Sequence, residues 1–500
     1  MNRPIRNLAV ACLVLFLALM INVTYLQYWQ SDDLTSLSKH ADNTRVRKAN
    51  YSQPRGAITA GNKVIAESRE VDDQYKYLRF YPAGPQYAAI SGFFAYSFGP
   101  TGIEATQNDV LSGEDPKLFA KRVVDLLRNE PTQGGTIATT INPAAQQAAF
   151  DGLRALGENV QGSVVALEPS TGRILAMVSS PSYEPNNLAS HDFVNVEKVW
   201  KRLIANKLSP LNNRAIEETL PPGSTFKLIT SAAALESGKY DPDTRVKGGA
   251  SLDLPLTSKN LVNEGGSSCG GDPITLRQAL EVSCNVSFGW LGLKLGAEAL
   301  REQARKFGFE QVYFHDLDDA LTSQASSEFV GIDGELPDKP QTAFSAIGQS
   351  NVRATPLQMA MVAAGIANGG RVMRPYLVDE IKSADLEVID KTTPKILTRR
   401  ALSPTHASEL TDMMVSVVDN GTGTNAQIPG IRVAGKTGTA QSAADRPPYA
   451  WFVCFADAGN DPKVAVAVLV QNAGVDRGEI SGNGLAAPIA KRVMEAVLGR

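Results

Sequence analysis

The chain has 500 residues, more than one ordinary domain of roughly 100–200 residues holds. Apolar residues make up 43% of it and charged residues 20%, which excludes a disordered chain and allows large cores. The net charge of −3 excludes a general nucleic-acid binder, which needs a basic surface for the phosphates. The four cysteines and four histidines form no C-x-x-C, H-x-x-x-H or H-E-x-x-H pattern, so we expect no metal site.

The N-terminus contains an apolar run from Leu8 to about Trp29. At roughly 1.5 Å a residue, a helix over this run is about 33 Å long and can cross a bilayer core. Arg3 and Arg6 precede the run and two aspartates follow it, so we expect the N-terminal end to stay in the cytoplasm and the rest to be exported. No A-x-A cleavage site follows, and residues 1–30 are therefore interpreted as a cytoplasmic tip and an uncleaved transmembrane anchor.

Export makes disulfide bonds possible. Cys12 lies in the expected membrane segment, and Cys454 lies in an apolar stretch typical of a core. Cys269 and Cys284 are near each other in the sequence, and two readings stay open for them: a disulfide bond or two free buried thiols.

Residues 31–155 form a mixed segment with several short apolar pieces and one helical pattern. In that pattern Asp115 is placed as an N-cap and Pro116 in the first turn. The apolar face of this helix would consist of Phe119, Val123, Leu126 and Leu127.

From about residue 160 the pattern changes to strands. Residues 162–180 predict a hairpin with its turn at 169–172, and three apolar strands are expected at 431–441, 450–456 and 463–471. A final helix is expected over 485–499, and helical patterns fill the interval between the two groups of strands. A sheet whose strands come from both ends, with helices inserted, predicts an α+β fold of αβα layers.

The first chemical motif is Ser224-Thr225-Phe226-Lys227, which follows Pro221-Pro222-Gly223 at the expected start of a helix. A spacing of three places Ser224 and Lys227 on one helix face. A serine hydroxyl becomes a nucleophile when a base takes its proton, and lysine is such a base when burial lowers its pKa. The same S-x-x-K spacing recurs at Ser36–Lys39, which is interpreted as a solvated stretch beyond the anchor.

The second motif is Ser283-Cys284-Asn285. Thr275 and Gln278 form a capping box that starts a short helix, and this helix should end near Val282. The motif then falls on a turn, from which Ser283 and Asn285 can point into a cleft. The competing S-x-N triplets at 258–260 and 481–483 are set aside, because the first lies in a polar loop and the second follows the third motif.

The third motif is Lys436-Thr437-Gly438-Thr439, at the start of an apolar strand. Lys436 supplies positive charge, and Thr437 and Thr439 supply hydroxyl donors. Gly438 is expected to remove a side chain where a substrate backbone approaches closely. An ordinary edge strand with a glycine bulge is the alternative, and the order of the three motifs argues against it.

In this order S-x-x-K, S-x-N and K-T-G resemble the penicillin-interacting serine enzymes. Further blocks resemble class B penicillin-binding proteins, most closely the actinobacterial penicillin-binding protein A type, over nearly the whole chain. These blocks are RGAI at 55–58, TTINPAAQQAA at 139–149, LEPSTGRILAMVSSPSYEPN at 167–186, AIGQSNVRATPLQMA at 346–360 and GTGTNAQIPGIRVAGKTGTAQ at 421–441. Ser350 departs from the family, which often has glycine at this place.

The resemblance implies a transmembrane anchor over 1–30, a non-catalytic pedestal or dimerisation domain over 31–155, and a transpeptidase domain over 156–500. This last domain would contain a five-stranded antiparallel sheet flanked by helices. The family cross-links peptidoglycan between D-Ala-D-Ala donor and amine acceptor stem peptides outside the membrane. It needs no cofactor, β-lactams inhibit it covalently, and its members can work with division-complex proteins.

Carried onto this sequence, the resemblance makes Ser224 the nucleophile and Lys227 its base. Ser283 would relay a proton to the leaving D-Ala, and Asn285 would hold Lys227 and the substrate amide. Lys436 would contact Ser283.

The resemblance also implies that Thr437 and Thr439 bind the terminal carboxylate. The N–H groups of Ser224 and Thr439 would form the oxyanion hole beside Gly438.

Alternatives remain. A D,D-carboxypeptidase has the same three motifs, and a division scaffold with a silent site is a reading from a different class. A class A enzyme would need a glycosyltransferase domain, for which 31–155 is short, and a β-lactamase would have neither the anchor nor the additional domain.

Overall fold

The computed structural model describes residues 3–28, 30, 51–118, 133–332, 334–440, 447–457 and 461–500. Two compact units divide the chain, one of residues 1–54 with 69–78 and one of residues 55–68 with 79–500. The helix expected after Asp115 falls mainly on 119–132, including Phe119, Val123, Leu126 and Leu127, and lies outside the described residues.

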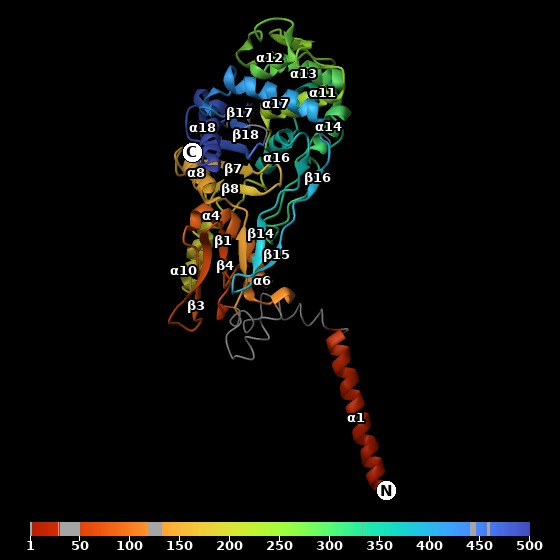
Figure 1. The fold of residues 1–500 in the computed structure, drawn as a ribbon, viewed down its shortest axis with the longest axis vertical. Coiled ribbons are helices and arrows are strands. Elements are labelled where there is room, and N and C mark those ends of the chain that lie inside the picture. The colour runs from red at the N-terminus through yellow and green to blue at the C-terminus, as the bar shows by residue number, and fades with distance from the viewer. Residues whose placement is uncertain are drawn as a thin grey trace. The chain divides into compact units, whose positions relative to one another are not determined.

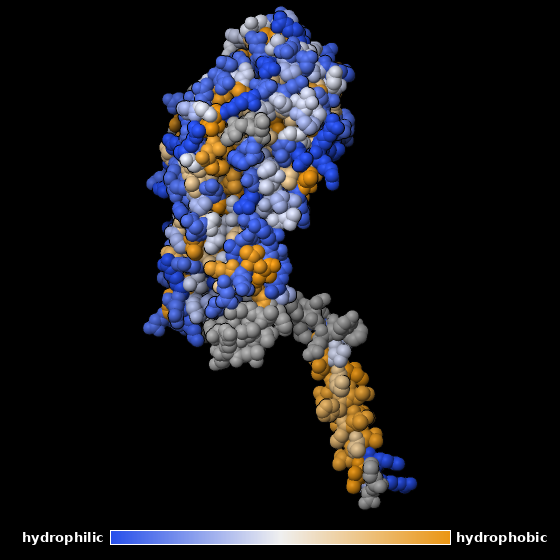
Figure 2. Space-filling model, viewed as in Figure 1, coloured by the Kyte–Doolittle hydropathy of each residue, from blue (hydrophilic) through white to orange (hydrophobic). Residues whose placement is uncertain are grey.

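The first unit contains helix α1, Arg3–Tyr28 (Figure 1). Apolar side chains cover most of the face of this helix that is seen in Figure 2, as is expected of a helix that contacts lipid. Its stretch Arg3–Leu26 is long and apolar enough to cross a membrane. The predicted anchor therefore forms a helix of the required length.

The second unit contains most of a six-stranded sheet of strand order β15-β14-β6-β1-β2-β3, whereas residues 69–70 of β2 and 77–78 of β3 belong to the first unit. β1 pairs with β6 in parallel and with β2 antiparallel, and β14 joins the far edge of β6. The strands are β1 Ile58–Ala60, β2 Lys63–Glu70, β3 Tyr77–Phe80, β6 Thr136–Thr139, β14 Val378–Lys382 and β15 Val388–Lys391. The sheet thus takes two strands from a segment more than 200 residues further along the chain than β6.

Short elements lie beside this sheet. They are α4 Gly84–Ser91, β4 Phe94–Ala95, β5 Gly99–Pro100, α5 Ile103–Thr106 and α6 Asn108–Ser112. A buried ion cluster joins α5 to the strands: the Glu104 carboxylate accepts hydrogen bonds from Arg55 Nε at 3.0 Å and from Arg79 Nε at 2.5 Å. All three side chains are at most 2% exposed. Because a buried charge needs a partner, the two arginines depend on one carboxylate.

A second sheet is five-stranded and antiparallel, with strand order β17-β18-β19-β7-β8. Its strands are β7 Gln161–Leu167, β8 Ile174–Ser180, β17 Arg432–Ala440, β18 Tyr449–Asp457 and β19 Val464–Asn472. The predicted hairpin and the three predicted C-terminal strands are all present, and the α+β fold with a five-stranded antiparallel sheet is confirmed.

Helices cover both faces of this sheet. α8 Pro143–Arg154 and α18 Ala487–Leu498 pack on one face, and α16 Pro356–Ala367 on the other. The alternating valines of β19, from Val464 to Val470, point into the core under α8 and α18, together with the buried free thiol of Cys454. Trp451 and Leu469 point into the larger core on the opposite face. The period-two pattern of the sequence therefore sets which side chains enter which core.

Most of the remaining helices build the upper part in Figure 1, around the large core, whereas α10, lower in the figure, and α9 contribute to a separate small core. The remaining helices are α9 Asn186–Ala189, α10 Phe193–Ile204, α11 Lys227–Glu236, α12 Leu276–Glu281, α13 Asn285–Leu295, α14 Ala297–Lys306, α15 Lys339–Ser345 and α17 Pro404–Asp419. Six short strand segments lie between them as three pairs: β9 Arg245–Val246 with β12 Ile274–Thr275, β10 Ser251–Asp253 with β11 Asn260–Val262, and β13 Val372–Met373 with β16 Ile396–Thr398.

Candidate active site

Ser224 lies in a 3₁₀ turn, Gly223–Phe226, that runs directly into α11. The expected position was the first turn of the helix itself, so the structure places the serine slightly earlier. Gly223 has a φ of +56°, and its N–H donates to the Gly348 carbonyl at 2.9 Å. Glycine permits this left-handed backbone, which turns the chain from the proline loop into α11.

Lys227, three residues on, is fully buried at the start of α11. Its Nζ donates to the Ser283 carbonyl and to Asn285 Oδ1, both at 2.7 Å, and to Ser283 Oγ at 3.2 Å. Burial holds the pKa of Lys227 well below its usual range, and the neighbouring Lys436 lowers it further. The lowered pKa favours the neutral amine, which is the form that can act as a base.

Ser283 and Asn285 lie where α12 ends and α13 begins. Thr275 Oγ1 accepts from the Gln278 N–H at 3.1 Å, so the capping predicted for α12 is present. Ser283 has a φ of +58°, a left-handed conformation that is uncommon for a residue with a side chain. The strained turn directs its hydroxyl between the two lysine amines, at 3.2 Å from Lys227 Nζ and 2.8 Å from Lys436 Nζ.

Lys436 lies in β17 and is fully buried. Besides Ser283 Oγ, the Lys436 Nζ contacts two oxygens of Thr437: the carbonyl oxygen at 3.1 Å and Oγ1 at 3.4 Å. Burial lowers the pKa of Lys436 to about 7, against the opposite effect of the Glu264 carboxylate. This group is therefore divided between ammonium and amine at neutral pH.

The place of Gly438 differs from the expectation. A Cβ on it would lie 2.9 Å from the Pro222 carbonyl oxygen and 3.0 Å from a methyl of Thr225. The missing side chain therefore lets β17 approach the chain before and after Ser224, not a substrate backbone. Side chains alternate along a strand, and Thr437 and Thr439 line the cleft on the other side.

Two adjoining hollows, of about 600 and 440 Å³, form the cleft. Both are lined by Ser224, Asn263, Glu264, Ser283 and Thr439. A larger hollow of about 740 Å³, beside Lys491 of α18, contains none of the motif residues among its lining. Chemistry and not size therefore identifies the site.

Sequence reasoning missed several residues of the cleft. Glu264 and Thr422 line it without belonging to a motif, and Ser481, Gly482 and Asn483, set aside as a chance triplet, line the smaller hollow. No motif contains Glu264 or Thr422, and the S-x-N spacing at 481–483 is the one signal for that loop; only the fold brings these separate loops together.

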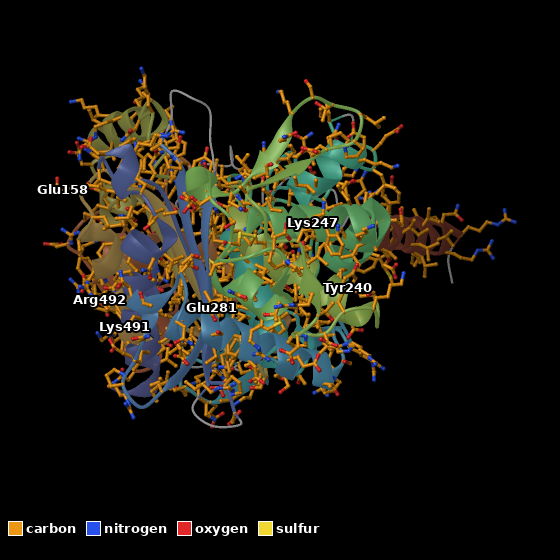
Figure 3. All side chains as sticks on the ribbon, turned by 90° about the horizontal axis from the view of Figure 1, so that it is seen from above. Glu158, Tyr240, Lys247, Glu281, Lys491 and Arg492 are labelled. Atoms are coloured by element: carbon orange, nitrogen blue, oxygen red, sulfur yellow. A yellow bond between two sulfur atoms is a disulfide. The ribbon has the colours of Figure 1, made fainter. Side chains whose placement is uncertain are left out.

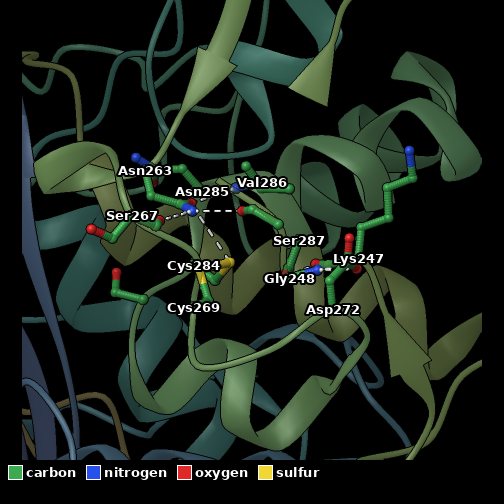
Figure 4. The surroundings of a disulfide bond; sticks show 12 residues. Lys247, Gly248, Asn263, Ser267, Cys269, Asp272, Cys284, Asn285, Val286 and Ser287 are labelled. Carbon is green, nitrogen blue, oxygen red and sulfur yellow. Dashed lines mark hydrogen bonds between the residues drawn. A yellow bond between two sulfur atoms is a disulfide. The ribbon is translucent and has the colours of Figure 1, made fainter. Parts of the chain in front are cut away.

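A disulfide bond joins Cys269 to Cys284, the middle residue of the second motif (Figure 4). The structure thus selects one of the two readings left open by the sequence. Asn263 supports the same loop: its Nδ2 donates to the carbonyls of Gly249 and Ser267, and its Oδ1 accepts from the Val286 N–H at 3.0 Å. One wall of the cleft is therefore tied to the start of α13.

Similarity to known proteins extends over the whole chain. The penicillin binding protein transpeptidase domain matches residues 162–495, and the penicillin binding protein A dimerisation domain matches residues 55–137. Peptidoglycan D,D-transpeptidase PbpA of Mycolicibacterium smegmatis is 43% identical to this chain, with 100% of this chain and 99% of that protein covered. The protein of the same name from Mycobacterium tuberculosis is 42% identical with the same coverage.

A solved structure is similar as well. Penicillin-binding protein A from M. tuberculosis, as its penicillin G acyl-enzyme complex, has a TM-score of 0.82 and 43% identity, covering 89% of this chain and 100% of that one. The matched domains, the full-length similarity and the shared fold lead to one conclusion. The chain belongs to the class B penicillin-binding proteins.

Proposed function

We propose that this protein is a peptidoglycan D,D-transpeptidase that cross-links stem peptides through an ester on Ser224. The observation that carries the proposal is the buried amine of Lys227, which is held by Ser283 and Asn285 one helical turn from a serine that lines the cleft. A lysine whose neutral form is favoured by burial can take a proton from a serine.

In the first half-reaction, the Ser224 hydroxyl attacks the carbonyl of the penultimate D-Ala and its proton passes to Lys227. The tetrahedral oxyanion would be held by the N–H groups of Ser224 and Thr439. Donors placed in advance in this way typically contribute about 3–4 kcal/mol each to the transition state. The peptide bond then breaks and leaves an acyl ester on Ser224.

The leaving D-Ala needs a proton on its nitrogen. Ser283 Oγ contacts both amines, so it can pass the proton from Lys227 to the leaving group. Asn285 would fix Lys227 and hold the substrate amide. Lys436 in its ammonium form, with Thr437 and Thr439, would bind the terminal carboxylate of the donor.

In the second half-reaction, a primary amine of another stem peptide attacks the ester. Lys227 receives the proton of this amine through Ser283, the Ser224 oxygen regains a hydrogen, and a new amide bond joins the two strands. A β-lactam replaces the donor and stops at the ester, which is the basis for inhibition. None of these steps calls for a cofactor.

We place the reaction outside the cytoplasmic membrane, with α1 as a single-pass anchor and residues 156–500 as the exported transpeptidase domain. Residues 31–155 would be a non-catalytic pedestal or dimerisation domain, which the family match over 55–137 supports. A role in septation with division-complex partners follows from family membership alone, and depletion of the protein with imaging of septa tests it.

The test of the chemistry is labelling of the full chain with fluorescent penicillin, followed by mass spectrometry to locate the adduct. We expect the adduct on Ser224, its loss in Ser224→Ala, and full labelling in Ser36→Ala. Ser36 begins the other S-x-x-K sequence and lies outside the described residues. A scaffold would give no adduct, and a β-lactamase would release it quickly.

A D,D-carboxypeptidase would form the same adduct, so a second assay is needed. The acyl-enzyme is offered a primary amine, and amide product is compared with hydrolysed product. A transpeptidase gives mainly the amide, whereas hydrolysis alone at every amine concentration would assign the protein to the carboxypeptidases.

A further inference from the structure

Thr422 lies between α17 and β17 and belongs to none of the three motifs. Its Oγ1 is 2.8 Å from Oγ1 of Thr437, and its side chain lines the same hollow as Ser224, Thr437 and Thr439. The contact therefore joins a residue of unassigned role to a hydroxyl that we expect at the donor carboxylate.

The main chain around Thr422 is held on the side of α12. The Thr422 N–H donates to the Glu281 carbonyl at 3.3 Å, and a Cβ on Gly421 would lie only 2.4 Å from that carbonyl oxygen. The Glu281 carboxylate accepts from Ser416 Oγ of α17. Glu281, labelled in Figure 3, is two residues before Ser283. The backbone at Glu281, which leads into Ser283, therefore also positions Thr422.

The other end of the same segment is held by the loop that precedes α18. The Asn425 N–H donates to Asn483 Oδ1, and Asn425 Nδ2 donates to the Asn483 carbonyl, both at 3.0 Å. Because both ends are anchored, the Thr422 hydroxyl has a fixed position relative to β17.

The hydrogen-bond capacity of Thr437 explains why this position matters. Its hydroxyl has one proton, and its oxygen faces Thr422 Oγ1 and, at 3.4 Å, Lys436 Nζ. A carboxylate only accepts hydrogen bonds, so Thr437 can bind one only by donating its proton to it. This requires that Thr422 is the donor in the contact between the two threonines.

We propose that Thr422 is a positioning residue for the donor peptide. It donates to Thr437 Oγ1, so that the proton of Thr437 points into the cleft toward the terminal carboxylate. The proposal rests on the proposed function, and it makes Thr422 a determinant of selectivity for donors that end in a free carboxylate.

The test uses the full chain in detergent with two donors: N-benzoyl-D-alanyl thioglycolate, which ends in a carboxylate, and its thioglycolamide, which ends in a neutral amide. Thiol release gives kcat/KM for each. We expect Thr422→Val, which keeps the shape and removes the hydroxyl, to lower kcat/KM about tenfold for the carboxylate donor only. Thr422→Ser restores the hydroxyl and should restore the rate.

The matched control is Thr405→Val, the same change in the first turn of α17. Thr405 is exposed and lines neither hollow of the cleft, so both donors should react as with the wild type. In a Thr437→Val background, adding Thr422→Val should have no further effect, because the two hydroxyls act through one bond.

An equal fall in kcat/KM for both donors in Thr422→Val would show a merely structural role and overturn the proposal. An unchanged kcat/KM for both donors would also overturn it. Penicillin labelling of Ser224 in every variant reports the proposed function separately. Loss of labelling in the wild type would refute that function, whereas normal labelling without donor discrimination refutes only the role of Thr422.

Discussion

Lys436→Met is expected to stabilise the protein at neutral pH while it removes activity. Lys436 is fully buried, and its Nζ donates to Ser283 Oγ at 2.8 Å. Methionine has a similar length, suits a buried position and has no charge to desolvate. The function of Lys436 therefore has a cost in folding free energy, and this cost depends on pH.

The size of the pH dependence follows from the pKa of Lys436. Burial lowers this pKa from 10.5 in the unfolded chain to about 7 in the folded protein. Between these values the unfolded chain binds the proton more strongly, so the free energy of unfolding of the wild type rises with pH. From about pH 7 to 9 the rise is about 2 kcal/mol, and Lys436→Met lacks it. The stability advantage of Lys436→Met over the wild type should therefore shrink by this amount as the pH rises.

Urea unfolding of both proteins at several pH values measures the difference. Lys391→Met is the control, because the exposed amine of Lys391 has its pKa raised by Glu380 and stays protonated in both states over this range. The difference in free energy of unfolding between Lys391→Met and the wild type should not change with pH. A constant difference for Lys436→Met as well would refute the lowered pKa of Lys436 and the mechanism built on it.

Three further predictions concern other parts of the molecule. The rate of acylation by penicillin should fall above about pH 7 as Lys436 loses its proton, and a rate that keeps rising to high pH would contradict this. Glu104→Gln should lower the free energy of unfolding by about 3 kcal/mol or more, because two buried arginines lose their counter-charge. In contrast, Asp390→Asn in the exposed pair with Lys117 should cost less than about 1 kcal/mol in the same urea experiment, and equal costs would argue against burial as the cause. Ser350→Gly should stabilise the protein by about 0.5–1 kcal/mol, since Ser350 has a φ of +61°, and a lower Tm would show that its side chain supports the cleft instead.

Local patterns in the sequence were sufficient for the strands and for the ends of the site helices. The alternation in β19, the turn between β7 and β8 and the cap on α12 involve residues within a few positions of one another, and the structure contains all of them. The three motifs could likewise be found from spacing. The structure places Lys227 Nζ within hydrogen-bond distance of Ser283 and Asn285, and Lys436 Nζ within hydrogen-bond distance of Ser283.

Long-range packing accounts for what the sequence could not predict. The absence of a side chain on Gly438 makes room for the Pro222 carbonyl, which is more than 200 residues away in the sequence. Thr422 and Asn483 reach the cleft from two separate loops. Ser224 precedes its helix by a 3₁₀ turn because Gly223 bonds to Gly348, another distant residue. Each of these positions is decided by a partner that spacing along the chain cannot reveal.

The late strands β14 and β15 have a consequence for how the chain is made. β6 pairs with β14 along one edge, so a ribosome must synthesise the chain beyond residue 391 before the first sheet is complete. Until then β6 presents unpaired backbone groups to other nascent chains. A fragment that stops at residue 155 would expose the same edge permanently and is expected to aggregate. The six-stranded sheet can therefore be completed only after most of the following domain has been synthesised.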